Sequence, residues 1–226
     1  MSKRKKLKTR YLKLPALLLV ICLFAIVHGA NAQSIDGWEQ AINLSKTGVS
    51  SNPTLIAGES GELTAFWKNS VDGYYFSTND GSNWASPGLG EFPFSTRAYT
   101  PNLPVSEPTP LFDPTMTSGS EGSILAFWAD ENEDLEYSRF DNAGPLGTLT
   151  SWSAPVVIDS QVVEVISHKT NEDVVHIAYV KRGFGASSGI YHQFSLNNGT
   201  SWSEATQVYS STFFGQSTPD SSEINF

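Results

Sequence analysis

The sequence predicts an all-β protein built from repeated antiparallel sheets, and two observations support that fold class. Short runs rich in aromatic and β-branched residues alternate with clusters of Gly, Asn, Asp and Ser, as strands and their turns do. The pattern of residues 53–77 also returns 61 residues later, so that Pro53 and Ser77 correspond to Pro114 and Ser138. No segment shows the apolar periodicity of a helix over a useful length.

The stretch 74–84 shows which pattern repeats. Three aromatic residues lead into small polar residues, then Gly81 and Trp84, and the same order returns at 191–202. Both turns read Ser-x-Asn-x-Gly-x-(Asn/Ser)-Trp. Short polar side chains bond back to the backbone and glycine accepts a positive φ, so the pattern predicts a tight hairpin turn. We expect each tryptophan to fold over its own turn, with a gain of about 2–3 kcal/mol from buried area.

These turns resemble the Asp box, or BNR repeat, of the sialidase-like β-propellers, whose pattern is Ser-x-Asp-x-Gly-x-Thr-Trp. Asparagine replaces the aspartate in both complete copies, and a third copy is degraded by an insertion before its tryptophan. The structural box residues are Ser77, Asn79, Gly81, Trp84, Ser138, Asp141, Gly144, Trp152, Ser195, Asn197, Gly199 and Trp202. The resemblance implies a partial sialidase-like β-propeller of about three four-stranded blades.

We expect the first blade to hold strands at 54–57, 62–68, 74–77 and after Trp84, and the second to repeat the first. The third blade is expected at 162–167, 174–180, 190–195 and 202–210. Residues 38–45 resemble the segments that begin at the box tryptophans, and are expected to form an outer strand without a blade of its own. Closed propellers generally use about 4–8 blades, so we expect a fragment of a larger propeller. Self-association into a ring, an open three-sheet arrangement and an unrelated β-sandwich are the alternatives.

The N-terminus is predicted to be a secretory signal peptide, residues 1–32. Seven basic residues lie within 3–13, an apolar run of 14 residues comes next, and Ala30-Asn31-Ala32 supplies small residues before cleavage at Gln33. A retained membrane anchor is the alternative, but that run is shorter than the about 20 residues that span a bilayer. We therefore expect a secreted, extracytoplasmic domain at 33–226 with no stable membrane insertion after cleavage.

Removal of the signal changes the charge balance. It leaves 7 basic and 23 acidic residues, a formal charge of −16, which argues against nucleic acid as a partner. Cys22 is the only cysteine and leaves with the signal, so the mature chain has no disulfide and no thiol chemistry.

Ligand contacts are expected on the face opposite the box turns, where loops between second and third strands and between blades lie. The candidate residues are Glu91, Arg97, Tyr99, Asp130, Glu133 and Arg182, with Phe92 and Phe94 as aromatic platforms. Solvated connectors are the alternative interpretation of these loops. No cofactor is expected; residues 130–134 alternate the oxygen donors that suit calcium, but lack the glycine and distal glutamate of a helix-loop-helix site. His168, His176 and His192 show no zinc spacing.

The resemblance to sialidases implies a tyrosine nucleophile paired with a glutamate, an aspartate acid/base and three arginines that grip the substrate carboxylate. The mature chain has only Arg97, Arg139 and Arg182, of which Arg139 lies within the degraded box, and the family's Phe-Arg-Ile-Pro signature is absent at 51–55. We assign no catalytic residue. We expect a non-catalytic propeller that binds a glycan or a cell-surface glycoprotein. The alternatives are the N-terminal part of an exo-α-sialidase-type glycoside hydrolase and a structural or adhesion module.

Overall fold

The computed structural model describes residues 41–94, 113–183 and 187–215. Residues 44–226 form one compact unit. Of the other unit, residues 1–43, only 41–43 are described, and they contain neither helix nor strand. The predicted signal peptide and its cleavage site at Gln33 lie outside the described residues. None of the described helical segments has the length and hydrophobicity that crossing a bilayer requires.

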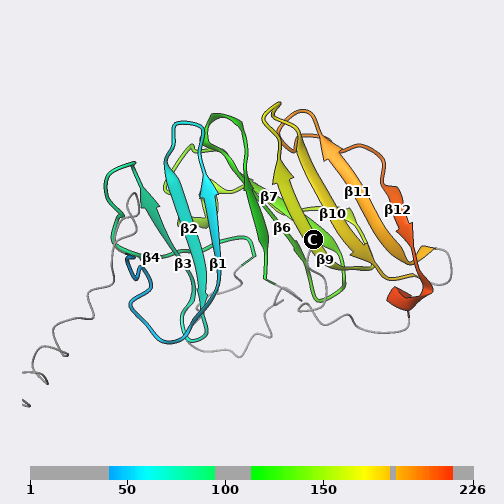
Figure 1. Cartoon of the computed structure of the whole chain (residues 1–226), viewed down its shortest axis with the longest axis horizontal. Coiled ribbons are helices and arrows are strands. Elements are labelled where there is room, and N and C mark those ends of the chain that lie inside the picture. The colour runs from blue at the N-terminus through cyan, green and yellow to red at the C-terminus, as the bar shows by residue number, and fades with distance from the viewer. Residues whose placement is uncertain (1–40, 95–112, 184–186, 216–226) are drawn as a thin grey trace, which may run out of the picture. The chain divides into compact units, whose positions relative to one another are not determined.

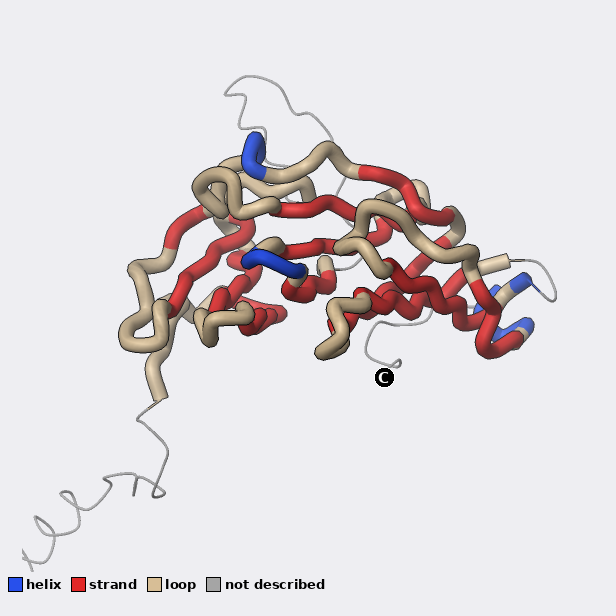
Figure 2. Tube along the Cα trace, turned by 90° about the horizontal axis from the view of Figure 1, so that it is seen from above, coloured by secondary structure: helices blue, strands red, loops and turns tan. Residues whose placement is uncertain are grey.

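The described part of residues 44–226 is all-β and forms three four-stranded antiparallel sheets (Figure 1). The first sheet contains β1 (Ser50–Ala57), β2 (Leu63–Asn69), β3 (Gly73–Asn79) and β4 (Gly88–Leu89). The second contains β5 (Thr115–Ser118), β6 (Ile124–Ala129), β7 (Leu135–Phe140) and β8 (Val156–Asp159). The third contains β9 (Val162–Lys169), β10 (Val175–Lys181), β11 (Gly189–Ser195) and β12 (Thr206–Ser210). Helical structure among the described residues is limited to short 3-10 turns such as η1 (Ser120–Gly122), η2 (Leu149–Ser151) and η4 (Thr212–Gly215) (Figure 2).

This topology confirms the predicted fold class. Within each sheet, strands that are consecutive in the chain lie next to each other, as in a propeller blade. The first strands of the sheets are also neighbours, because β5 contacts both β1 and β9. The repeat is visible in the register as well: Ala65 pairs with Ser77 in the first sheet, and Ala126 pairs with Ser138 in the second.

The fourth strand of the third sheet, expected at 202–210, is the shorter β12, which begins only at Thr206. The fourth strand of the first sheet lies after Trp84, as expected, but it is only the two-residue β4, which comes directly after Pro87. Proline has no N–H to donate to a ladder, so pairing begins only after it. Residues 41–45, the described part of the expected outer strand at 38–45, contain no strand. No described strand pairs with them, and a strand needs a partner for its backbone groups.

The strand β6 explains how the sheets pack. All six of its residues are buried. Successive side chains of a strand point to opposite faces, so a strand buried on both faces must be apolar throughout. The even-numbered residues of β6 join a core with the first sheet, which we call the first seam: Ile56, Phe66, Tyr74, Phe92, Phe94, Met116, Ile124, Ala126, Trp128, Phe140 and Trp152. Its odd-numbered residues join a core with the third sheet, the second seam: Leu125, Phe127, Ala129, Leu135, Val162, Val175, Ile177 and Tyr179.

Phe92 and Phe94, expected to be stacking platforms for a ligand, are core residues instead. Each side chain is 1% exposed. Their ring centroids lie 5.1 Å apart in parallel planes, and both rings meet Trp152 edge-on at 5.8 and 6.0 Å. Enclosed rings cannot stack on a ligand, so the prediction for these two residues is wrong. The physical reason is that both side chains, at the described start of the proline-rich link, pack into the first seam, and no local sequence pattern shows this.

The box tryptophans do not share one environment. Trp152 is 6% exposed, and its indole N–H donates to a carbonyl of its own loop at 2.9 Å. Trp202 packs edge-on against Phe127 and Tyr137 of the preceding sheet, at 5.5 and 5.8 Å. Trp84 is half-buried, and no ring contact of it is found in the described residues. The expectation that each indole covers its own turn is therefore wrong for Trp202, which helps to close the second seam.

The two turns with matching sequences also differ in hairpin register. In the first sheet, the Ser77 hydroxyl donates to the carbonyl of Ala85, the residue after the tryptophan, at 2.7 Å. In the third sheet, Gln193 donates to the equivalent carbonyl at 2.7 Å. The Ser195 hydroxyl instead accepts the backbone N–H of Gly199 at 2.9 Å. The box of the third sheet is thus displaced by two residues along its strand.

Candidate functional site

The acidic loop 130–134 and Arg182 meet at the second seam, where two of the loop carboxylates already have partners. Glu133 and Arg182 form an ion pair. The carboxylate of Asp130 accepts two backbone N–H groups of its own turn, at 2.8 and 2.9 Å. Among the residues that the structure describes, no three His, Cys, Asp or Glu side chains converge as metal ligands would. The structure therefore brings Glu133 and Arg182 together as an ion pair, while Nε of Arg182 is enclosed without a hydrogen-bond partner among the described residues.

The other residues predicted to contact a ligand do not come together in the described structure. Glu91 is exposed, and its backbone N–H donates to Gly147 at 3.0 Å. Arg97 and Tyr99 lie outside the described residues. Arg139 lies at the box turns, as expected, where its guanidinium donates to Asp141 at 3.2 Å and to the backbone of the third-sheet turn at 3.1 Å.

Two buried tyrosines donate to carboxylates. The Tyr74 hydroxyl donates to Asp113 at 2.7 Å, with Lys68 3.2 Å from the same carboxylate. The Tyr179 hydroxyl donates to Asp159 at 2.7 Å. Burial, reinforced by the adjacent carboxylate, raises the pKa of each tyrosine well above its ordinary value. A nucleophilic phenol needs the opposite shift, so both tyrosines act as hydrogen-bond donors.

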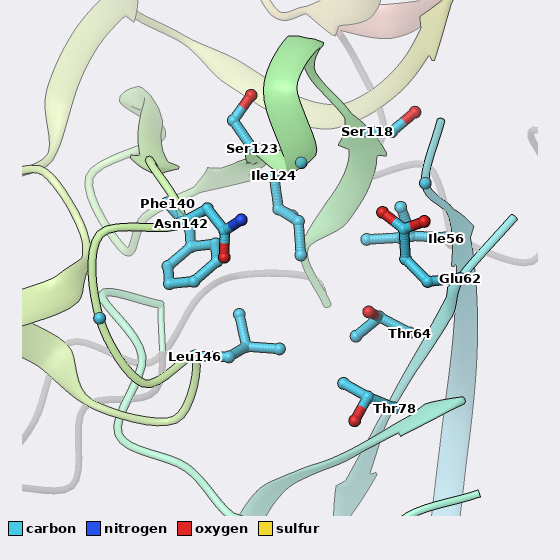
Figure 3. A pocket seen from close by; sticks show the side chains of 13 residues that line it. Ile56, Glu62, Thr64, Thr78, Ser118, Ser123, Ile124, Phe140, Asn142 and Leu146 are labelled. Carbon is cyan, nitrogen blue, oxygen red and sulfur yellow. The ribbon is translucent and has the colours of Figure 1, made fainter. Parts of the chain in front are cut away.

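A cavity of about 260 Å³ lies between the first and second sheets, at the end that carries the box turns (Figure 3). Its apolar lining continues the first-seam core: Ile56, Ile124, Phe140 and Leu146. Its polar side chains are Glu62, Thr64, Thr78, Ser118, Ser123 and Asn142. Figure 3 shows Glu62, Thr64 and Thr78 on one wall and Phe140, Asn142 and Leu146 on the facing wall.

This end of the sheets is not the one where the sequence predicts ligand contacts, and that expectation stays a prediction. Thr78 of the first box and Gly144 of the degraded box both line the cavity. The reason is the insertion in the degraded box, because the lengthened loop after β7 supplies Asn142, Gly144 and Leu146 to the second wall. The insertion is therefore the one sequence signal of the site, although by itself it indicates only a degraded structural motif.

The polar groups of the cavity are suited to hydrogen bonding with a small ligand. Glu62 is the only acidic side chain among its described lining residues, and its Oε2 is enclosed without a hydrogen-bond partner in the described part of the chain. Leaving such an acceptor unpaired costs on the order of 1–3 kcal/mol or more. Glycoside hydrolysis ordinarily needs two carboxyl groups about 5–10 Å apart. The described lining supplies one.

A histidine pair on the third sheet is a feature that sequence reasoning misses. His176 Nδ1 lies 2.9 Å from His192 Nε2. The ring centroids are 5.2 Å apart and the planes differ by 18°, so the rings meet edge to edge through an N–H···N bond. Burial and the neighbouring His192 and His168 lower the pKa of His176. The sequence predicts a strand for each residue, but spacing does not give the register between β10 and β11 across a long loop.

The architecture is that of a propeller-type all-β protein, and the amphiphilic cavity lies between two of its sheets. No family model matches the chain, and no curated protein matches it. Solved structures that match include a protein of unknown function from Dyadobacter fermentans, at 15% identity and a TM-score of 0.46, covering 70% of this chain and 41% of that one.

Glycoside hydrolases are also among the matching structures. An exo-β-1,3-galactanase from Phanerochaete chrysosporium has 12% identity and a TM-score of 0.41, over 70% of this chain and 36% of that one. An intramolecular trans-sialidase from Ruminococcus gnavus has 16% identity and a TM-score of 0.39, over 69% and 33%. This chain thus spans less than two thirds of each of these proteins. Likeness at such identities concerns the fold and does not carry an activity.

Proposed function

We propose that this protein binds carbohydrate without hydrolysing it, and that the first-seam cavity holds the sugar. The observation that carries the proposal is the amphiphilic lining of that cavity. One part is apolar, and the other offers hydroxyl groups, an amide and one carboxylate with an unpaired oxygen. Small-molecule sites combine an apolar surface with a few convergent polar groups in this way. The C–H faces of a sugar ring suit the apolar part of the cavity lining, and its hydroxyl groups suit the polar part.

Two further features favour binding over catalysis. The described lining contains one carboxylate, Glu62, where a glycosidase pair needs two. The buried tyrosines Tyr74 and Tyr179 have raised pKa values and already donate to carboxylates, so neither resembles a sialidase nucleophile. Sialidase-type hydrolysis and a purely structural or adhesion role remain the alternative hypotheses, and no described feature favours either.

The proposal includes a secreted location and a glycan of a cell-surface glycoprotein as partner. The support is the predicted signal peptide at residues 1–32 and the acidic mature chain. The proposal also assigns the turns after β3, β7 and β11 to the Asp-box type, on the basis of their Ser, Asn or Asp, Gly and Trp pattern. The two-residue displacement of the third turn is tolerated because a hairpin can close in either register.

The test is titration of the secreted chain with a panel of methyl glycosides, monitored by NMR shifts of the methyl groups of Thr64, Thr78 and Ile124. Binding should shift these cavity signals, and Thr78→Phe, which fills the cavity, should abolish the effect. Ser82→Phe is the matched control, since Ser82 lies in the turn directly after β3 and does not line the cavity. No shift with any glycoside would refute sugar binding. A parallel assay with a fluorogenic sialoside should show no turnover, and turnover would favour the hydrolase.

A further inference from the structure

The hairpin turn before β2 fixes the place of Glu62, the one acidic side chain in the described lining of the first-seam cavity. The N–H of Gly58 donates to the carbonyl of Glu62 at 2.8 Å, and the N–H of Gly61 donates to the carbonyl of Gly58 at 3.2 Å. The side chain of Glu62 folds back over Gly58, where an added Cβ would collide with Oε1 and Cδ. Glycine at position 58 therefore leaves the space that the carboxylate occupies.

The strand register places hydroxyl groups on the same wall as this carboxylate. Thr64 comes two residues after Glu62, and alternate residues of an extended chain share a face. Thr64 pairs with Ile56 of β1 on one side and with Thr78 of β3 on the other. Figure 3 shows Glu62, Thr64 and Thr78 together on one wall. This wall thus combines one carboxylate with two hydroxyl groups.

The charge of the lining is not balanced. Oε2 of Glu62 is enclosed without a hydrogen-bond partner among the described residues. The described lining contains no lysine, arginine or histidine. A carboxylate in such a place is stabilised most by a hydrogen-bond donor that is itself positively charged. A ligand carboxylate would instead meet a like charge, so the lining favours a cationic group and disfavours an anionic one.

We infer that the first-seam cavity takes the protonated amine of an amino sugar, with Glu62 as the counter-ion. This inference rests on the proposed sugar binding and names the class of sugar. A primary ammonium group has three N–H donors. One donates to Oε2 of Glu62, and the hydroxyl groups of Thr64 and Thr78 are acceptors for the others. The apolar part of the lining packs against the sugar ring.

The test compares two probes that differ only at this group, methyl 2-amino-2-deoxy-β-glucoside and methyl β-glucoside. Dissociation constants come from NMR titration of the full chain at pH 6.5, where such an amine is protonated and a carboxylate is ionised. The amino sugar should bind at least about tenfold more tightly, which is the effect of one charge-assisted hydrogen bond. Equal affinities would overturn the inference and leave sugar binding intact. Absence of binding by both probes and by every member of the glycoside panel would overturn both proposals.

Two further probes test the ligand class from either side. A methyl sialoside, which carries a carboxylate, should bind more weakly than methyl β-glucoside. Butylammonium, which carries the positive charge without a sugar ring, should bind more weakly than the amino sugar. Binding of either probe as tight as that of the amino sugar would refute the assignment to an amino sugar.

Variants at two positions separate recognition from folding. Glu62→Gln keeps the size of the side chain but removes its charge, so the preference for the amino sugar should disappear. Glu121→Gln is its control, because it removes one charge at an exposed position that does not line the cavity. Gly58→Ala keeps the charge but displaces the carboxylate, so the preference should fall, whereas a Cβ at Gly48 meets no atom within 4 Å and Gly48→Ala should change nothing. A full preference in folded Glu62→Gln or folded Gly58→Ala would refute the role of Glu62.

Discussion

The box tryptophans provide a sharp test of how the sheets are held together. Trp152 and Trp84 occupy equivalent places after the third strand of adjacent sheets. Trp152 is 6% exposed, meets the rings of Phe92, Phe94 and Phe140, and donates a 2.9 Å hydrogen bond. Trp84 is half-buried without a ring contact in the described residues. The same substitution at the two positions should therefore have very different effects.

Trp152→Ala should lower the free energy of unfolding by roughly 3–5 kcal/mol, the usual range for truncating a buried aromatic residue. Trp84→Ala should cost about 1 kcal/mol, as for a partly exposed site. For a chain of this size, the melting temperature changes by about 2–4 °C per kcal/mol. The expected losses are thus roughly 6–20 °C for Trp152→Ala and a few degrees for Trp84→Ala.

Urea unfolding monitored by far-ultraviolet circular dichroism would give both free energies, and calorimetry the melting temperatures. Trp152→Phe is a useful intermediate, because it keeps an aromatic ring but removes the indole N–H. Equal losses for Trp152→Ala and Trp84→Ala would show that each indole stabilises only its own turn. That result would refute the assignment of Trp152 to the first seam.

Three other measurements test separate parts of the molecule. The Asn198 carboxamide accepts the N–H of Ser120 at 3.1 Å and donates to the hydroxyl of Ser123 at 2.8 Å, so Asn198→Ala should cost about 1–3 kcal/mol of unfolding free energy in urea titration. The lowered pKa of His176 means that the folded state resists protonation there, so stability should be retained above the ordinary pKa of 6.5 and fall as the pH drops below it. His176→Phe should therefore flatten the stability–pH curve below pH 6.5 more than His192→Phe does. An unchanged curve in His176→Phe would show that His176 does not cause the loss of stability. Mass spectrometry of the exported protein should find an N-terminus at Gln33, and an intact N-terminus would favour the anchor.

The fold is predictable because its signals are local. Strand, turn and glycine patterns repeat at a fixed interval, and the glycines at 81 and 199 take the positive φ that the turn pattern demands, 92° and 80°. A periodic, self-consistent pattern of this kind specifies sheets of the right number and order. The extent of a strand is less predictable, since Pro87 delays pairing of β4 in a way that aromatic content does not show.

The candidate site is not predictable, because it depends on which side chains meet across a seam. Glu62 and Asn142 are ordinary turn residues in the sequence, and only the packing of the two sheets places them on facing walls of one cavity. The pairing of Glu133 with Arg182 also requires the third sheet to lie beside the second. Conversely, Phe92 and Phe94 resemble exposed aromatic residues in the sequence because nothing in a linear pattern indicates enclosure.

The contacts of Trp202 set the size of the smallest piece of this architecture that could fold autonomously. Its indole packs against the rings of Phe127 and Tyr137, which belong to the preceding sheet. A single excised sheet would therefore present half of an apolar interface to water, whereas two consecutive sheets would enclose one whole interface. For protein engineering, the transferable module is the pair of sheets.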